Sequence, residues 1–174
     1  MSEIFLTFHD DLYRFGLKLS GDQNMVQDCI QDLFLKLWKN RGNLKPVESI
    51  KPYLFRSLRN HITDSINLQK PKISMDQRFE NPSEFTYSHE DFLIAQQVSE
   101  ETRLKVIEAL NKLTMRQRET IYLRYFEDFD FETIAIIMDM NIQSVRNLLY
   151  RGMKVLRDLL LAETFFIMLA KSLP

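Results

Sequence analysis

The strongest constraint on the fold is an interruption of helical periodicity in the middle of the chain. The stretch "LQKPKISMDQRFENPSEFTYSHE", residues 68 to 90, contains two prolines, is net acidic and shows no helical period. On both sides of it apolar residues recur at helical spacing, and glycine occurs only four times in 174 residues. The sequence therefore predicts an all-α protein of two small helical domains, residues 1–67 and 92–174, joined by a flexible linker at 68–91.

The first domain is predicted to contain three helices, over residues 3–20, 22–39 and 49–67. Asp22 is expected to cap the second helix and Ser49 the third, because short polar side chains accept hydrogen bonds from the first N–H groups of a helix. The stretch "NRGNLKPVE", residues 40 to 48, reads as a loop. The residues expected to form the apolar faces of the first two helices are Phe5, Phe8, Leu12, Phe15, Leu19, Val26, Ile30, Leu33 and Leu37.

The second helix carries a further face with a different composition. Asp28, Gln31, Asp32, Leu35 and Trp38 recur at helical spacing away from the apolar face. A polar and acidic surface with a large aromatic residue at one end suits docking to another protein's helices. The alternative is a solvated face with Trp38 placed in the core.

The third helix interleaves cations with aromatic residues. Arg56, Arg59 and His61 alternate with Tyr53, Phe55 and Asn60 in "KPYLFRSLRNHITDSIN". Charge for a backbone and flat side chains for unstacked bases are what single-stranded DNA requires. The alternative is an ordinary core helix with a basic exterior.

The second domain ends in a predicted helix-turn-helix. Helical patterning resumes near Phe92, and Thr114 with Gln117 forms a capping box for the next helix. Asp130 is expected to cap a scaffold helix, the turn "DMN" follows, and a second helix runs over 143–158. Ile142, Val145 and Leu149 are expected to pack into the core. The outer residues are then Gln143, Ser144, Arg146, Asn147, Tyr150, Arg151 and Lys154.

These outer residues suit DNA. Amide and guanidinium groups near the start of the helix fit base edges in the major groove, and the later cations fit phosphates. The alternative for this stretch is a packed helical hairpin with a solvated charged face.

Composition excludes several other classes of protein. A net charge of −1 gives no global attraction to nucleic acid. The single cysteine, Cys29, forms neither an internal disulfide nor a cysteine zinc site, and no spacing of histidines, glycine-rich loop or nucleophile motif indicates a catalytic residue, metal or cofactor. We see no signal peptide, and "FFIML" is too short to cross a membrane. The sequence predicts a soluble, cytoplasmic, non-enzymatic protein.

Taken in order, these segments resemble the extracytoplasmic-function (ECF) sigma factors of bacterial RNA polymerase, in the sigma-70 family. "DCIQDLFLKLW" resembles the region that grips the clamp helices of the polymerase's largest subunit. "YLFRSLRNHITDSI" resembles the helix that melts and reads the minus-ten element, preceded by a loop that captures a flipped-out base. "ALNKLTMRQRETIYLRYFEDFDFETIAIIMDMNIQSVRNLLYRGMKVLR" resembles the domain that reads the minus-thirty-five element.

The resemblance implies a role for each group of candidate residues. Core polymerase, through its clamp helices and flap, and promoter DNA are the implied partners, together with an anti-sigma factor. Core binding is implied for Asp28, Gln31, Asp32, Phe34, Leu35 and Trp38. Minus-ten binding is implied for Asn43, Tyr53, Arg56, Arg59, Asn60 and His61. Minus-thirty-five binding is implied for the outer residues of the last helix.

The sequence also departs from the family pattern. Leu148 and Met153 stand where basic residues are frequent, and the tail from 161 to 174 is unusually apolar. A competing interpretation is a response-regulator output domain, whose helix-turn-helix is similar, and a third is a structural helical adaptor. Residues 1–67 lack the alternating strands and acidic pocket of a receiver domain, which favours the sigma-factor interpretation.

Overall fold

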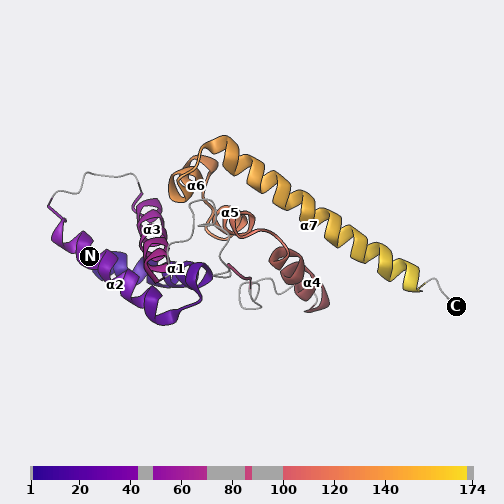
Figure 1. Cartoon of the computed structure of the whole chain (residues 1–174), viewed down its shortest axis with the longest axis horizontal. Helices are drawn as coiled ribbons and strands as arrows, with labels where there is room; N and C mark the ends of the chain where they lie inside the picture. Colours follow the sequence, from indigo (N-terminus) through magenta and orange to yellow (C-terminus); the bar gives the residue numbers. More distant parts are fainter. Residues whose placement is uncertain (1, 43–48, 70–84, 88–99, 172–174) are drawn as a thin grey trace. The chain divides into compact units, whose positions relative to one another are not determined.

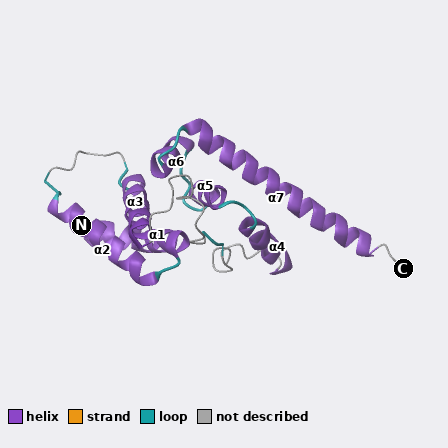
Figure 2. Cartoon of the chain, viewed as in Figure 1, coloured by secondary structure: helices purple, strands orange, loops and turns teal. Residues whose placement is uncertain are grey.

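The computed structural model describes residues 2–42, 49–69, 85–87 and 100–171, and in these ranges every regular element is a helix (Figures 1 and 2). This confirms the predicted all-α class. Side-chain surroundings are described as far as Leu161. The helices are α1 (Ser2–Ser20), α2 (Gln23–Lys39), α3 (Lys51–Gln69), α4 (Glu100–Asn111), α5 (Met115–Tyr125), α6 (Phe131–Met138) and α7 (Ile142–Lys171).

Contacts divide the chain into two units. The first comprises Met1–Phe85 with Glu132–Asn141, and the second comprises Thr86–Phe131 with Ile142–Pro174. In the first unit α1, α2 and α3 each contact the other two. In the second unit α7 contacts both α4 and α5. Each unit therefore buries its own set of helical apolar faces.

The core of the first unit follows the predicted apolar spacing. Leu12, Phe15 and Leu19 of α1 are buried, and the rings of Phe15 and Phe55 lie 5.0 Å apart. All four residues predicted for the apolar face of α2 are buried as well. Phe5 and Phe8 are the exceptions among the predicted residues of α1: Phe5 keeps 37% of its surface exposed and Phe8 is half-buried, because both lie in the first two turns of the helix.

Local signals explain where the helices of the first unit begin and end. Gly21, at φ +68°, follows α1 in the left-handed conformation that suits a helix end. Asp22 caps α2 as predicted, accepting hydrogen bonds from the N–H groups of Asn24 and Met25. The prediction for Ser49 was wrong. Since α3 starts at Lys51, the capping position is Ile50, whose carbonyl accepts the first helical hydrogen bond from Leu54.

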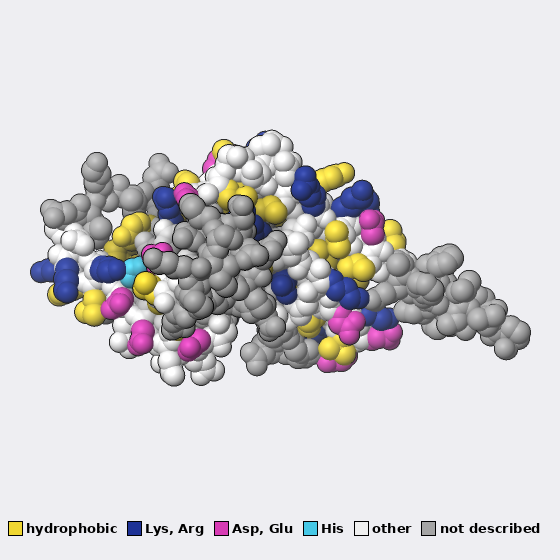
Figure 3. Space-filling model, viewed as in Figure 1, with side chains coloured by type: hydrophobic (Ala, Val, Ile, Leu, Met, Phe, Trp, Pro, Cys, Tyr) yellow, Lys and Arg dark blue, Asp and Glu magenta, His cyan; other side chains and the backbone are white. Residues whose placement is uncertain are grey.

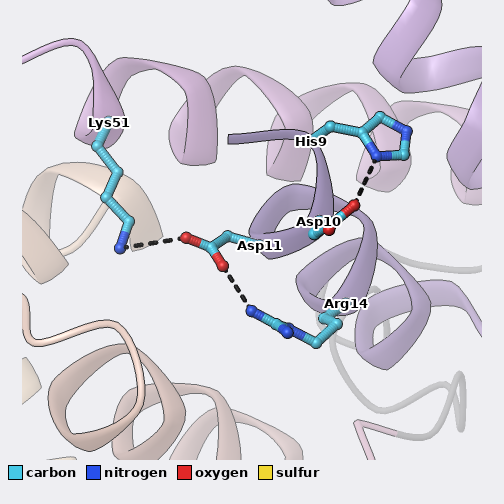
Figure 4. Close-up of polar contacts among 5 residues, drawn as sticks. All are labelled: His9, Asp10, Asp11, Arg14 and Lys51. Atoms are coloured by element: carbon cyan, nitrogen blue, oxygen red, sulfur yellow. Dashed lines mark hydrogen bonds and ion pairs between the residues drawn. The ribbon is translucent and has the colours of Figure 1, made fainter. Parts of the chain in front are cut away.

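A charged contact joins the start of α3 to α1 (Figure 4). The Asp11 carboxylate lies 3.7 Å from the Lys51 ammonium and 2.5 Å from the Arg14 guanidinium. Lys51 also lies 5.6 Å from the centroid of the Phe55 ring. Because Lys51 is the first residue of α3, these contacts supplement a helix start that has no polar cap.

The second unit begins with the described residues Thr86 and Tyr87 and continues with α4 at Glu100. The predicted helical pattern at 92–99 lies outside the described residues. Thr114 and Gln117 form the predicted capping box at the start of α5: the Gln117 N–H donates to Thr114 Oγ1, and the Thr114 N–H donates to Gln117 Oε1. Ile121, Tyr122, Leu123 and Val145 belong to the buried set.

The helix-turn-helix consists of α6, a turn at 139–141 and α7. Helix α6 starts directly after Asp130, at the predicted place, and Asp139 adopts φ +53° in the turn. Two expectations need correction. Ile142 stays 37% exposed and so does not pack fully into the core, because it is the first residue of its helix. Helix α7 does not end near Asp158 but continues to Lys171, since no proline or glycine interrupts it there.

Parts of the predicted linker, residues 68–91, are helical or buried in the structure. Helix α3 extends two residues past the predicted end at 67, and residues 70–84 and 88–99 lie outside the described part of the chain. Between them, Phe85 and Tyr87 are buried, with 0% and 2% of their surfaces exposed. The prediction of a flexible linker did not include the burial of these two side chains. Their side chains are large enough to compensate the ordering of a short segment.

Gly16 supplies a test of the packing in the first unit. A Cβ atom at Gly16 would lie 2.7 Å from Val26 Cγ1 and 3.2 Å from Ile62 Cδ1. We expect Gly16→Ala to lower the free energy of unfolding by about 1–2 kcal/mol, because overpacking outweighs the gain in helix propensity. Urea unfolding followed by the fluorescence of Trp38, the single tryptophan, reports on this unit. Gly42→Ala is the control, because a Cβ there would meet no atom within 4 Å.

Candidate protein and nucleic-acid interfaces

The predicted second face of α2 is exposed. We call Asp28, Gln31, Asp32, Phe34, Leu35 and Trp38 the α2 outer face. Leu35 and Trp38 keep 55% and 52% of their surfaces exposed, and the three polar residues are exposed as well. This excludes the alternative in which Trp38 lies in the core. An exposed face of this kind combines large apolar groups with carboxylates, as protein-docking surfaces do.

Neighbouring groups position the aromatic members of the α2 outer face. The Phe34 ring is half-buried and meets the Phe5 ring edge-on, with centroids 5.0 Å apart. The Arg41 guanidinium lies 4.5 Å from the centroid of the Trp38 ring, and its Nη1 donates a hydrogen bond of 2.8 Å to the Trp38 carbonyl. A cation held against one side of the indole restricts its rotation while leaving half of its surface exposed.

Helix α3 presents the predicted mixture of flat and charged groups. Tyr53, Arg56 and Asn60 are exposed, while Arg59 and His61 are half-buried. The sixth candidate, Asn43, lies outside the described residues. Because Leu54, Phe55, Leu58 and Ile62 are buried, the first three point away from the core of the first unit.

Two contacts of these residues were not foreseen from the sequence. The Lys36 ammonium lies 2.6 Å from His61 Nε2, and because an ammonium can only donate, the imidazole nitrogen accepts. The Arg56 guanidinium lies 3.7 Å from the carboxylate of Asp139. Both partners are distant in sequence from α3, so no helical spacing could have indicated them.

Helix α7 exposes the predicted outer residues at its N-terminal half. Gln143, Arg146, Asn147, Tyr150, Arg151 and Lys154 are exposed, and Ser144 is half-buried. Within this set the Gln143 side-chain amide donates a hydrogen bond of 3.1 Å to the side-chain oxygen Oδ1 of Asn147. The Arg146 guanidinium lies 5.4 Å from the centroid of the Phe131 ring. Figure 3 shows Lys and Arg side chains interspersed with hydrophobic ones along this helix.

The anchoring side of α7 consists of Val145, which is fully buried, and Leu149, which is half-buried. Gly152 lets α5 approach closely, since a Cβ there would lie 3.2 Å from Ile121 Cδ1. Leu148 is half-buried and Met153 is 43% exposed, so neither adds charge to the exposed face. The small apolar contact made by Val145 and Leu149 thus leaves the polar outer residues on the solvent-exposed side of α7.

Among the described residues we also looked for a reactive thiol and for a metal site. Burial raises the pKa of the Cys29 thiol, which lies 3.8 Å from the Ser65 hydroxyl. In the same part of the chain no three His, Cys, Asp or Glu side chains gather around a possible metal position. None of the described helices is both long enough and apolar enough to cross a membrane.

Two family models match the chain. Residues 4–71 match "Sigma-70 region 2", which spans α1 to α3, and residues 103–156 match "Sigma-70, region 4", which spans most of α4 to α7. The first match contains the α2 outer face and the α3 candidates, and the second contains the outer residues of α7. A response-regulator interpretation accounts for the second segment only.

Individual proteins that are similar to this chain are also sigma factors. The chain is 29% identical to the RNA polymerase sigma factor SigV of Bacillus subtilis over 154 residues, which cover 88% of this chain and 86% of that protein. It is 24% identical to the ECF RNA polymerase sigma factor SigX of the same organism over 160 residues, or 88% of this chain and 80% of that protein.

Two solved structures share the fold. One is the sigma factor RpoE in complex with the anti-sigma factor NepR from Bartonella quintana, with a TM-score of 0.63, 24% identity and coverage of 91% of this chain and 95% of that one. The other is CnrH in complex with the cytosolic domain of CnrY, with a TM-score of 0.57, 18% identity and coverage of 92% and 87%.

The exposure of Trp38 can be tested directly by fluorescence. With about half of the indole in contact with water, we expect a red-shifted emission that acrylamide quenches readily. The urea-unfolded chain provides the fully exposed reference. A blue-shifted emission resistant to acrylamide would show that Trp38 is in the core and that the α2 outer face is wrongly assigned.

Proposed function

The chain belongs to the sigma-70 family, and we propose that it binds core RNA polymerase through the α2 outer face and directs it to promoters through α3 and α7. The observation that carries this proposal is the two-sided character of α2. Its aliphatic face is buried within the first unit, while Trp38, Leu35 and three polar residues remain exposed on the other side. Large apolar side chains exposed next to one another and flanked by carboxylates are the combination that a docking surface offers to a partner.

Binding to polymerase is expected to depend on a few residues of this face. Trp38 and Leu35 offer the apolar area that becomes buried, and tryptophan is enriched among residues that dominate interface energies. Asp28, Gln31 and Asp32 add hydrogen-bond acceptors and negative charge, which favour a polar or basic partner surface. We assign this partner surface to the clamp helices of the largest polymerase subunit, with the flap as a contact of the second unit.

The proposed role of α3 is to hold the melted minus-ten element. Tyr53 is exposed for stacking on an unpaired base, and Arg56 supplies positive charge for the DNA backbone. Asn60 provides an exposed amide that can read a base edge. Arg59, His61 and Asn43 complete the proposed set. The contact of Lys36 with His61 supports this placement, because it brings a further cation to the same surface.

The proposed role of α7 is to read the minus-thirty-five element. Gln143, Arg146 and Asn147 lie in the first two turns, where side chains reach base edges in the major groove. Their contacts with one another and with Phe131 reduce the side-chain entropy lost on binding. Arg151 and Lys154 lie farther along the helix and suit backbone phosphates. Tyr150 and Ser144 are the remaining members of the set.

The net charge of −1 fits a protein whose DNA affinity depends on its partner. Polymerase supplies most of the affinity and all of the chemistry, so the chain acts as a non-enzymatic subunit in the cytoplasm, without a cofactor. One of the solved structures described above contains a sigma factor bound to an anti-sigma factor. We extend this to the present chain and propose an anti-sigma factor as a further partner.

The first test concerns core binding. We expect Trp38→Ala and Gln31→Ala to weaken the affinity for core polymerase, with a loss for Trp38→Ala of about thirtyfold or more, because truncated anchors cost about 2 kcal/mol or more. Leu68→Ala is the control, because Leu68 is 86% exposed at the far end of α3. Circular dichroism confirms that the helices persist. Unchanged affinity in the two variants would remove the assignment.

The second test separates base reading from charge attraction. We expect Arg146→Ala to cost about 1–3 kcal/mol of discrimination and to relax preference at one promoter position. Lys154→Ala is expected to weaken binding to all sequences alike and to lower the salt slope by about one. Binding of holoenzyme to promoter variants across a salt series measures both effects. Identical behaviour of the two variants, with sequence preference unaltered, would refute base reading by α7.

A further inference from the structure

One aromatic ring in the second unit lies close to two cations that come from different helices. The Arg124 guanidinium of α5 lies 5.6 Å from the centroid of the Phe131 ring, and the Arg146 guanidinium of α7 lies 5.4 Å from it. Both distances are within the range of cation–π attraction, which extends to about 6 Å. All three residues belong to the second unit. The half-buried Phe131 ring therefore links the last turn of α5 to the second turn of α7.

The backbone that carries Phe131 is fixed by a tight turn between α5 and α6. Asp128 adopts φ +56° in this turn, a left-handed conformation in which aspartate is more common than most other residues. Phe129 is buried, and its N–H donates a hydrogen bond of 3.0 Å to the Leu123 carbonyl. Phe131 follows two residues later as the first residue of α6, so its side chain starts from a defined place on the backbone.

The half-buried Arg124 side chain holds the same turn from the side of α5. Its Nη1 donates a hydrogen bond of 2.9 Å to the Phe129 carbonyl and lies 3.9 Å from the Asp128 carboxylate. A hydrogen bond from a charged donor is stronger than one between neutral groups. Arg124 therefore contacts both the Phe129 backbone and the Phe131 ring, which restricts the place of the ring further.

Arg146 is the partner of the ring that meets DNA in the proposed function. Its side chain is exposed on the outer side of α7. A long side chain on a surface has many rotamers, and this freedom is lost when the guanidinium binds one base edge. Attraction to the Phe131 ring restricts the side chain before DNA arrives. Unlike a carboxylate, an aromatic ring does this without neutralising the charge that DNA requires.

The position of the Arg146 guanidinium decides which group on DNA it binds. A guanidinium held near the start of a recognition helix can make a bidentate contact with one base edge, and this contact distinguishes that base pair from the others. The same guanidinium without restraint can reach backbone phosphates, which are alike at every sequence. Loss of the ring is therefore expected to weaken sequence discrimination without changing the number of positive charges that DNA meets.

We propose that Phe131 is a positioning residue for base reading, which holds Arg146 at one base pair of the minus-thirty-five element and is itself held in place by Arg124. The inference rests on the proposed function, because it requires α7 to read that element. Phe131 sets the specificity through Arg146 and not through a contact of its own with DNA. Neither Phe131 nor Arg124 is among the residues that the sequence indicated for DNA binding.

Binding of holoenzyme to a promoter and to its single-base-pair variants tests this role. The base pair in question is the one at which Arg146→Ala relaxes the preference. We expect Phe131→Leu, which keeps an apolar side chain but has no ring, to lower discrimination at that base pair about two- to fivefold, as loss of an exposed cation–π contact would. The salt slope should stay unchanged, because no charge is removed. Phe131→Tyr keeps an aromatic ring and should keep the discrimination.

Further variants separate positioning from packing. In the Arg146→Ala chain, adding Phe131→Leu should not lower discrimination further, because the side chain that the ring positions is already gone. Arg124→Ala leaves the ring in place and should also relax the preference at the same base pair. Tyr125→Leu is the matched control, because it removes an exposed aromatic ring from α5, and it should leave discrimination unchanged. Circular dichroism checks that each variant keeps its helices.

The outcomes distinguish this inference from the proposed function. If Phe131→Leu keeps full discrimination, weakens binding to all sequences alike, or lowers discrimination further in the Arg146→Ala chain, the positioning role is overturned and the proposed function stays intact. If Phe131→Leu loses its helices, Arg124→Ala decides, and an unaltered preference in that variant overturns the positioning role. If Arg146→Ala itself relaxes no preference, base reading by α7 is overturned, and the positioning role with it.

Discussion

Burial of the aliphatic face of α2 is the interaction on which the rest of the first unit depends. Val26, Ile30, Leu33 and Leu37 fix the rotation of this helix against α1 and α3. At about 0.8 kcal/mol per buried methylene group, their burial outweighs any preference of the exposed side chains. Once the rotation is fixed, Gln31 and Trp38 have to point outward, because residues at helical spacing share a face.

The rotation of α7 is fixed in the same way, by burial of a smaller apolar area. Val145 is buried and Leu149 half-buried, so a narrow contact orients the exposed amides and cations on the opposite side. The exposed groups then interact locally: Gln143 with Asn147, and Arg146 with Phe131. In both helices a buried stripe determines which polar groups remain for a partner. In the function proposed above, partners bind the sides of the helices that folding leaves exposed.

Local sequence signals predicted most of the fold, because the features concerned involve neighbouring residues. The cap at Asp22 and the capping box at Thr114 each join groups within three residues, and the buried stripes follow from helical spacing. Features formed across the sequence escaped prediction. The contact between Lys36 and His61 joins residues 25 positions apart, and Tyr87 is bound by residues 24 to 39 positions away. An aromatic residue in a proline-containing segment does not by itself indicate which distant residues it will pack against. Ser49 failed as a cap because a one-residue shift of the helix start places another residue at that position.

The most direct test of the account is transcription by core RNA polymerase reconstituted with this chain on genomic DNA. Mapping the start sites should yield a set that is absent with core alone, and this set should share two sequence elements, near minus ten and near minus thirty-five. The Arg146→Ala chain should keep the minus-ten element in its start sites and relax the minus-thirty-five element. Start sites identical to those of core alone, or starts without shared elements, would contradict the assignment of α2, α3 and α7 to polymerase and promoter binding.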